Sequence, residues 1–231
     1  MDMVDQEKDN NRRLSCASSA LEGVRFVLPT TEWGAWMGRM KEELFKPSID
    51  PQLRQFYSLQ LLMMEALKEL DKGNQAKTEQ ILEQILSMSP DEIPFNSKAF
   101  LIDSIQEELL LLNKERSALE AYRQKIQAAE LLAEKRVCSS LYSEARVASV
   151  LNETEKIEAA LQEIVDGACT ENSSMKGVLL ARSRLWLASV LIEQGEKERA
   201  RKLIEVFRET WDSEAILLER MTSVAALEAR L

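Results

Sequence analysis

The sequence predicts an all-α protein, and two observations support this fold class. Only five prolines and seven glycines occur in 231 residues, whereas Leu, Ala, Glu and Gln, which favour helices, are abundant. Apolar residues also recur at the spacing of one helix face on both sides of Gly195. They are Leu187, Ala188 and Leu191 before the glycine, and Ala200, Leu203, Ile204 and Phe207 after it. Two amphipathic helices therefore meet at Gly195, which ends the first by adopting a left-handed conformation at little cost.

Composition narrows the class of protein. The chain has 231 residues, of which 45% are hydrophobic. It can therefore bury a sizeable core, either as one large domain or as a continuous array. Its formal net charge of -9 argues against nucleic acid as the main partner, since phosphate contacts need concentrated Lys and Arg. No apolar run approaches the roughly 20 residues that span a bilayer. We therefore expect a cytoplasmic protein that does not bind nucleic acid.

The first 20 residues are polar and begin with acids, so they lack the basic start and apolar run of a secretory signal. We expect 1–20 to be a flexible tail and 21–231 to be a single helical-repeat domain. The three cysteines, Cys16, Cys138 and Cys169, are an odd number in separate segments. That pattern fits a reducing compartment better than a disulfide framework, so we expect packed or exposed thiols.

An N-terminal helix is predicted over TTEWGAWMGRMKEELF, with Thr31 as its cap. Its apolar stripe consists of Trp33, Trp36, Met37, Met40 and Leu44. One interpretation is that the stripe packs on the first repeat as a cap. A second is that it is exposed and binds a partner or a second copy in a homodimer. Binding at a membrane interface is a third interpretation, weakened by the mixed charges of RMKEELFK.

Four helix pairs are expected next, because the pattern around Gly195 recurs at Gly73, Asn113 and Glu155 with a period of about forty residues. The pattern has four columns, at offsets of about -7, -4, +5 and +9 from each break. It expects small residues at -7 and +5 and larger residues at -4 and +9. These columns are Ala66, Glu69, Thr78 and Leu82; Gln106, Leu109, Ala118 and Tyr122; Ala148, Leu151, Ala160 and Ile164; and Ala188, Leu191, Ala200 and Ile204. Small residues at -7 and +5 would let two antiparallel helices approach closely. The expected pairs are 51–90, 96–130, 133–168 and 173–210, followed by a capping helix over 212–230.

Two of these units carry a resemblance to the tetratricopeptide-repeat family. LASVLIEQGEKERARKLIEVF matches the family pattern well, and EALKELDKGNQAKTEQILEQILSMSP matches it with Pro90 at the closing position. The resemblance covers roughly residues 60–210, with a period longer than the family's usual 34. It implies antiparallel helix pairs stacked as a right-handed α-solenoid. In that fold the first helix of each pair lines a concave groove, where peptides or partner helices bind.

The family's groove positions fall on two sets of residues here. They are Tyr142, Ala145, Arg146, Ser149 and Asn152, then Arg182, Leu185, Ser189 and Ile192. Arg146 and Arg182 could receive an acidic side chain or a C-terminal carboxylate through bidentate hydrogen bonds. The alternative is that these arginines pair with surface glutamates such as Glu144 or Glu193. The expected ligand is an amphipathic or partly acidic segment.

Catalysis is disfavoured because the sequence contains no histidine. The absence removes the usual Ser-His and Cys-His nucleophiles and His-ligated zinc, and no glycine-rich phosphate loop is present. Carboxylate pairs such as Glu107 and Glu108 or Glu153 and Glu155 fit a solvated helix face or turn better than an acid–base pair. We expect no enzyme activity, cofactor or metal.

The leading hypothesis is therefore a non-catalytic adaptor or chaperone that holds a protein partner in its groove. One alternative is a regulatory or sensor protein whose repeats respond to a peptide or small effector. Another is a structural subunit of a larger assembly.

Overall fold

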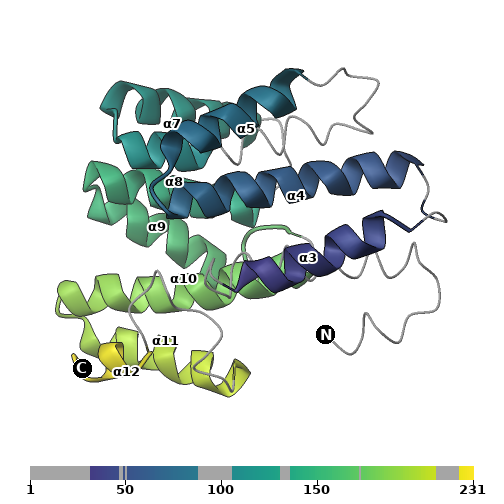
Figure 1. Ribbon diagram of the computed structural model, residues 1–231. Helices are drawn as coiled ribbons and strands as arrows, with labels where there is room; N and C mark the ends of the chain where they lie inside the picture. Colours follow the sequence, from purple (N-terminus) through teal and green to yellow (C-terminus); the bar gives the residue numbers. More distant parts are fainter. Residues whose placement is uncertain are drawn as a thin grey trace. The chain divides into compact units, whose positions relative to one another are not determined.

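The computed structural model describes residues 32–46, 49, 51–87, 106–130, 136–171, 173–211 and 224–231. Every regular element in these ranges is a helix, so the all-α class is confirmed (Figure 1). The chain divides into two compact units, Met1–Leu112 and Asn113–Leu231, which are described separately below. The expected tail over 1–20 lies outside the described residues. The prediction of one repeat domain over 21–231 stays a prediction.

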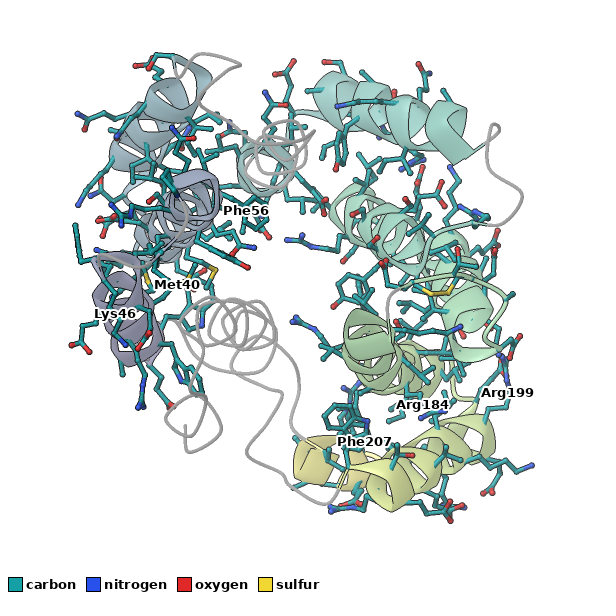
Figure 2. The ribbon with its side chains drawn as sticks, turned by 90° about the vertical axis from the view of Figure 1, so that its right-hand side faces the viewer. Met40, Lys46, Phe56, Arg184, Arg199 and Phe207 are labelled. Atoms are coloured by element: carbon teal, nitrogen blue, oxygen red, sulfur yellow. A yellow bond between two sulfur atoms is a disulfide. The ribbon has the colours of Figure 1, made fainter. Side chains whose placement is uncertain are left out.

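The first unit contains α3 (Trp33–Leu44), α4 (Pro51–Asp71) and α5 (Gln75–Ser87). Helix α4 packs against both α3 and α5. The buried side chains form one cluster that includes Met40, Met64 and Ile85, with Phe56 packed at its edge (Figure 2). Helix α4 begins at Pro51 because proline has no N–H to leave unpaired and its fixed φ suits the first helical position.

The second unit contains six helices in its described part. They are α7 (Arg116–Glu130), α8 (Cys138–Leu151), α9 (Thr154–Val165), α10 (Ser173–Glu193), α11 (Lys197–Thr210) and α12 (Val224–Glu228). Each of α7 to α11 packs on the next helix in the chain, and α8 also lies against α10. Helix α10 therefore contacts α8, α9, α11 and α12, and no described side chain between Lys176 and Ile192 is fully exposed.

Three helix pairs are joined by the same turn. Gly73, Asn152 and Gly195 have φ of 76°, 61° and 84°, and each is the first or second residue after the first helix of its pair. In each turn the next residue's N–H donates to a carbonyl five residues back, as from Glu196 to Leu191 at 2.8 Å. Glycine adopts this conformation freely, and asparagine is the residue other than glycine that tolerates it best. The turn chemistry thus repeats even where glycine does not.

Two of the predicted breaks are therefore in the wrong place. The break expected at Glu155 is at Asn152, and Glu155 is the second residue of α9. The break expected at Asn113 is at Lys114, whose φ is 56°. Ala148 and Ala160 match the alanine columns when Glu155 is taken as the break, whereas the left-handed residue is Asn152. With Asn152 as the reference, the buried small residue seven positions earlier is Ala145, which is 0% exposed.

The close helix contacts occur where small residues lie on facing helices. Ala188 and Ala200 are both fully buried on the packed helices α10 and α11. In the first unit, Thr78 is fully buried, and its hydroxyl donates to the Ala66 carbonyl at 3.2 Å. A side chain that bonds the backbone of the neighbouring helix requires the two helices to be in close contact. These pairs occupy the -7 and +5 columns of their units.

The expectation of free thiols is wrong for two of the three cysteines. Cys138 and Cys169 form a disulfide, with their Cα atoms 5.0 Å apart (Figure 2). The sequence separation of 31 residues concealed this proximity. Helix α9 runs back along α8, so the chain returns to its starting point, where an isolated parallel bridge joins Val137 and Thr170. Cys16 lies outside the described residues.

The last described helix, α12, closes the second unit. Its Val224 and Leu227 are buried against α10 and α11. Arg208 donates two hydrogen bonds to the Glu228 carboxylate, at 2.7 and 2.9 Å. These hydrogen bonds and the charge of Arg208 lower the pKa of Glu228 despite partial burial. Of the capping helix expected over 212–230, residues 212–223 lie outside the described residues.

Candidate functional site

Helices α8 and α10 bring two of the predicted groove residues into direct contact. Arg182 Nε donates a hydrogen bond to the Tyr142 hydroxyl at 3.1 Å. The Arg182 guanidinium carbon also lies 5.6 Å from the centre of the Tyr142 ring, which is within the range of a cation–π interaction. Tyr142 is 9% exposed and Arg182 is half-buried. The pair therefore lies where α8 meets α10, at the edge of the buried core.

Trp186 completes this cluster, and the sequence analysis missed it. Its ring packs edge-to-face on Tyr142, with centroids 5.6 Å apart and an interplanar angle of 75°. Trp186 lies four residues after Arg182, so the two side chains share one face of α10. That spacing was the available signal, but the groove positions carried over from the repeat family fall on Leu185 instead. We refer to Tyr142, Arg182 and Trp186 as the aromatic–arginine cluster.

The other predicted groove residues divide into two groups. Arg146 is half-buried one turn after Tyr142, Ser149 is exposed one turn further along α8, and Ser189 is half-buried on α10. Asn152 is exposed and forms the left-handed cap of α8. The remaining members are in the core: Ala145, Leu185 and Ile192, which are 0%, 1% and 8% exposed. The first group extends the aromatic–arginine cluster along α8 and α10.

The two glutamates considered as partners for Arg146 and Arg182 form salt bridges with other arginines. Glu144 pairs with Arg136, which also binds Glu163 on α9 at 2.8 Å. Glu193 pairs with Arg230 at 3.4 Å. Arg136 therefore links α8 to α9, and Arg230 links the end of the described chain to α10. Glu144 and Glu193 therefore each join two parts of the second unit through Arg136 or Arg230.

Helix α10 carries a further arginine on its other side. Arg184 lies two residues after Arg182, which is about 200° around the helix. Burial lowers the pKa of Arg184 below its ordinary value. Figure 2 labels it in the second unit, together with Arg199 and Phe207 of α11. Arg184 thus lies apart from the aromatic–arginine cluster, and we do not include it in the candidate site.

The Trp-rich stripe of the N-terminal helix is packed into the first unit. Trp33, Met37 and Met40 are 4%, 6% and 0% exposed, and Trp36 is half-buried against the same core cluster. Helix α3 lies on α4, so this arrangement corresponds to the interpretation in which the stripe packs as a cap. Apolar side chains buried in this way stabilise the unit and offer little surface to a partner.

A polar cleft of about 320 Å³ lies between α3 and α4. It is lined by Gly34, Met37, Gly38, Lys41, Glu65, Lys68, Glu69 and Lys72. Within it the Glu69 carboxylate accepts hydrogen bonds from Lys72 at 2.7 Å and Asn74 at 3.0 Å. The bond from Lys72 lowers the pKa of Glu69, with burial acting in the opposite direction. Because lysines and glutamates alternate around this cleft, their fields largely cancel, and it is a weaker candidate than the α8–α10 face.

The described residues contain no cluster of three or more His, Cys, Asp or Glu side chains placed to hold a metal ion. In the same part of the chain, no helix combines the length and apolar character needed to cross a bilayer. Comparison with models of known protein families, with curated proteins and with solved structures finds no match to this chain.

Proposed function

We propose that this protein is a non-catalytic interaction module, an adaptor or chaperone, that binds an acidic, amphipathic segment of a protein partner on the α8–α10 face. The observation that carries the proposal is the aromatic–arginine cluster, in which Tyr142 of α8 meets Arg182, forty positions later, and Trp186 of α10. In the proposed arrangement, the α8–α9 and α10–α11 pairs stack as part of a right-handed solenoid, with α8 and α10 on its concave side.

The residue types of this face suit recognition of a peptide. Tyr, Trp and Arg are the residues that most often dominate the free energy of protein interfaces. Arg146 and Arg182 supply guanidinium groups that recognise carboxylates by paired hydrogen bonds. Trp186 is half-buried and supplies flat apolar surface next to those charges, while the buried Tyr142 ring holds Arg182 and Trp186 in position. An acidic segment with apolar side chains on one face matches both features.

The contact between α8 and α10 supports the stacking. In a solenoid of helix pairs, the first helices of successive pairs lie side by side, and the second helix of one pair packs on the first of the next. Helix α8 lies against α10, and α9 packs on α10. The pairs themselves share their turn chemistry at Asn152 and Gly195.

The test begins with peptides selected from a random library displayed on phage, using the immobilised full chain. We expect selected peptides to be rich in Asp and Glu with interspersed apolar residues. Their affinity should fall by more than about tenfold in Arg146→Glu/Arg182→Glu, because like charges replace two carboxylate-binding groups.

The matched control is Arg199→Glu/Arg201→Glu, which makes the same change of charge on exposed positions of α11. The control should bind as the wild type does, apart from a small general electrostatic effect that salt removes. Equal loss of affinity in both double variants would show that binding follows net charge, and the α8–α10 face would be rejected.

A further inference from the structure

The disulfide lies at the base of the α8–α10 face. Cys138 is the first residue of α8 and lies one helical turn before Tyr142, so both side chains are on the same face of the helix. Cys169 lies in the segment that connects α9 to α10, the helix that carries Arg182 and Trp186. Both sulfur-bearing residues are buried, at 0% and 2% exposure. The covalent bond therefore joins the start of one side of the face to the segment leading into the other.

Hydrogen bonds also join the two sides of this junction. The Cys138 N–H donates to the Thr170 carbonyl at 3.0 Å, and the Thr170 N–H donates to the Arg136 carbonyl at 2.9 Å. Lys176, in the first turns of α10, donates from Nζ to the Cys169 carbonyl at 3.0 Å. The Ser139 hydroxyl donates to Glu171 at 2.7 Å, at an exposed position. Without the covalent bond, water competes for these hydrogen bonds.

We propose that oxidation of Cys138 and Cys169 completes the α8–α10 face, so that partner binding depends on the redox state of this pair. The expected effect on partner binding rests on the proposed function. The expected effect on the α8–α10 face rests only on the structure of the junction. In the dithiol form the start of α8 separates more readily from the segment before α10. Tyr142 then loses its fixed position against Arg182 and Trp186.

The oxidant is a disulfide, either of a small thiol compound or of a protein. One cysteine thiolate attacks a sulfur of this external disulfide and releases one external thiolate, leaving a mixed disulfide. The second cysteine thiolate attacks the mixed disulfide, forms the Cys138–Cys169 bond and releases the second external thiolate. The pair loses two electrons and two protons, and the external disulfide becomes two thiols. Because both cysteines are buried in the oxidised protein, reduction requires this junction to open first.

The first measurement follows hydrogen exchange and does not need a ligand. The full chain carries Cys16→Ser, so that Cys138 and Cys169 are its only cysteines. Oxidised protein is compared with protein reduced by a phosphine, and alkylation followed by mass measurement verifies each state. We expect amides of residues 138–146 and of 182–189 to exchange at least about tenfold faster after reduction, while those of α11 change much less.

The second measurement uses the phage-selected acidic peptide as the probe. Its dissociation constant should rise at least about tenfold on reduction, by the same loss of constraint. The variant Cys138→Ala/Cys169→Ala should match the reduced protein and should not respond to the phosphine. Circular dichroism of both forms verifies that the helices persist, so that loss of binding is not loss of the fold.

Unchanged exchange at 138–146 and 182–189 in fully reduced protein would overturn the inference, as would an unchanged dissociation constant for the peptide. If selection yields no peptide that binds even the oxidised chain, the proposed function fails. Hydrogen exchange still decides separately whether the disulfide controls the face.

Discussion

Replacing Gly195 with alanine measures the free energy of a single backbone conformation. Gly195 has a φ of 84°, and a Cβ atom built on it would meet nothing within 4 Å. The cost of the substitution is therefore conformational, with no steric contribution from neighbouring atoms. An L-residue pays about 1–2 kcal/mol to adopt the left-handed region. Alanine also restricts the unfolded chain, which offsets about 0.4–1 kcal/mol. The net expected loss of stability is therefore between about 0 and 1.6 kcal/mol.

Gly177 provides a matched control for this prediction. It lies inside α10, and a Cβ there would also meet nothing within 4 Å, but its φ is not in the left-handed region. Gly177→Ala should therefore stabilise the second unit by about 0.5–1 kcal/mol, the ordinary difference between the two residues in a helix. Replacing glycine with alanine should therefore stabilise the second unit at position 177, inside α10, and destabilise it at position 195, in the turn after α10.

The assay is urea unfolding of the second unit. Trp186 and Trp211 lie in that unit, and Trp33 and Trp36 lie in the first. Fluorescence of a chain with Trp33→Phe/Trp36→Phe therefore reports the second unit. The midpoints of the two glycine variants should move in opposite directions with an unchanged slope m. If Gly195→Ala stabilises as much as Gly177→Ala does, the left-handed turn between α10 and α11 is not formed.

Three other predictions follow from packing and charge. Ala188→Leu should cost about 1–3 kcal/mol by overpacking the α10–α11 contact, and an unchanged urea midpoint would show that the site has room. Trp33→Ala should cost about 3–5 kcal/mol in the first unit, because the ring is 4% exposed, and thermal unfolding should detect a loss of this size. Arg123 pairs with Glu153 at 2.7 Å. Burial raises the pKa of Glu153, but the hydrogen bonds and charges of Arg123 and Lys156 outweigh burial and lower this pKa below its ordinary value. Stability from that carboxylate is present above its unfolded pKa and disappears as pH falls through the folded value, so Arg123→Ala should make acid unfolding below about pH 4.5 less steep.

The fold class and the helix turns could be predicted because they depend on local patterns. Helical spacing around Gly195 and a proline at residue 51 act within a few residues of the element that they specify. Gly73 and Gly195 were recognised because glycine is the usual residue in a left-handed turn. Asn152 has the same conformation, but asparagine also occurs in many other settings. The break was therefore placed at Glu155, where the nearby alanines fit the repeat.

The candidate site was only partly predictable because it depends on contacts between distant parts of the chain. Tyr142 and Arg182 were named from the repeat pattern, and they do meet. Trp186 was missed because its role depends on which side of α10 faces α8, and α10 has no single apolar face that would indicate this side. The Cys138–Cys169 bond was missed for a similar reason. Its two residues meet only after α9 has folded back along α8.

The same bond has a mechanical consequence for the chain. Residues 138–169 form a covalent ring, so a force applied to the two ends of the protein passes through the sulfur atoms and leaves the residues between them unloaded. The 31 residue steps inside the ring would contribute roughly 100 Å of extended chain if they were free to stretch. With the ring closed, the load crosses a Cα–Cα distance of 5.0 Å. Pulling single molecules should therefore give an unfolded length shorter by about 100 Å in the oxidised protein than in the reduced one.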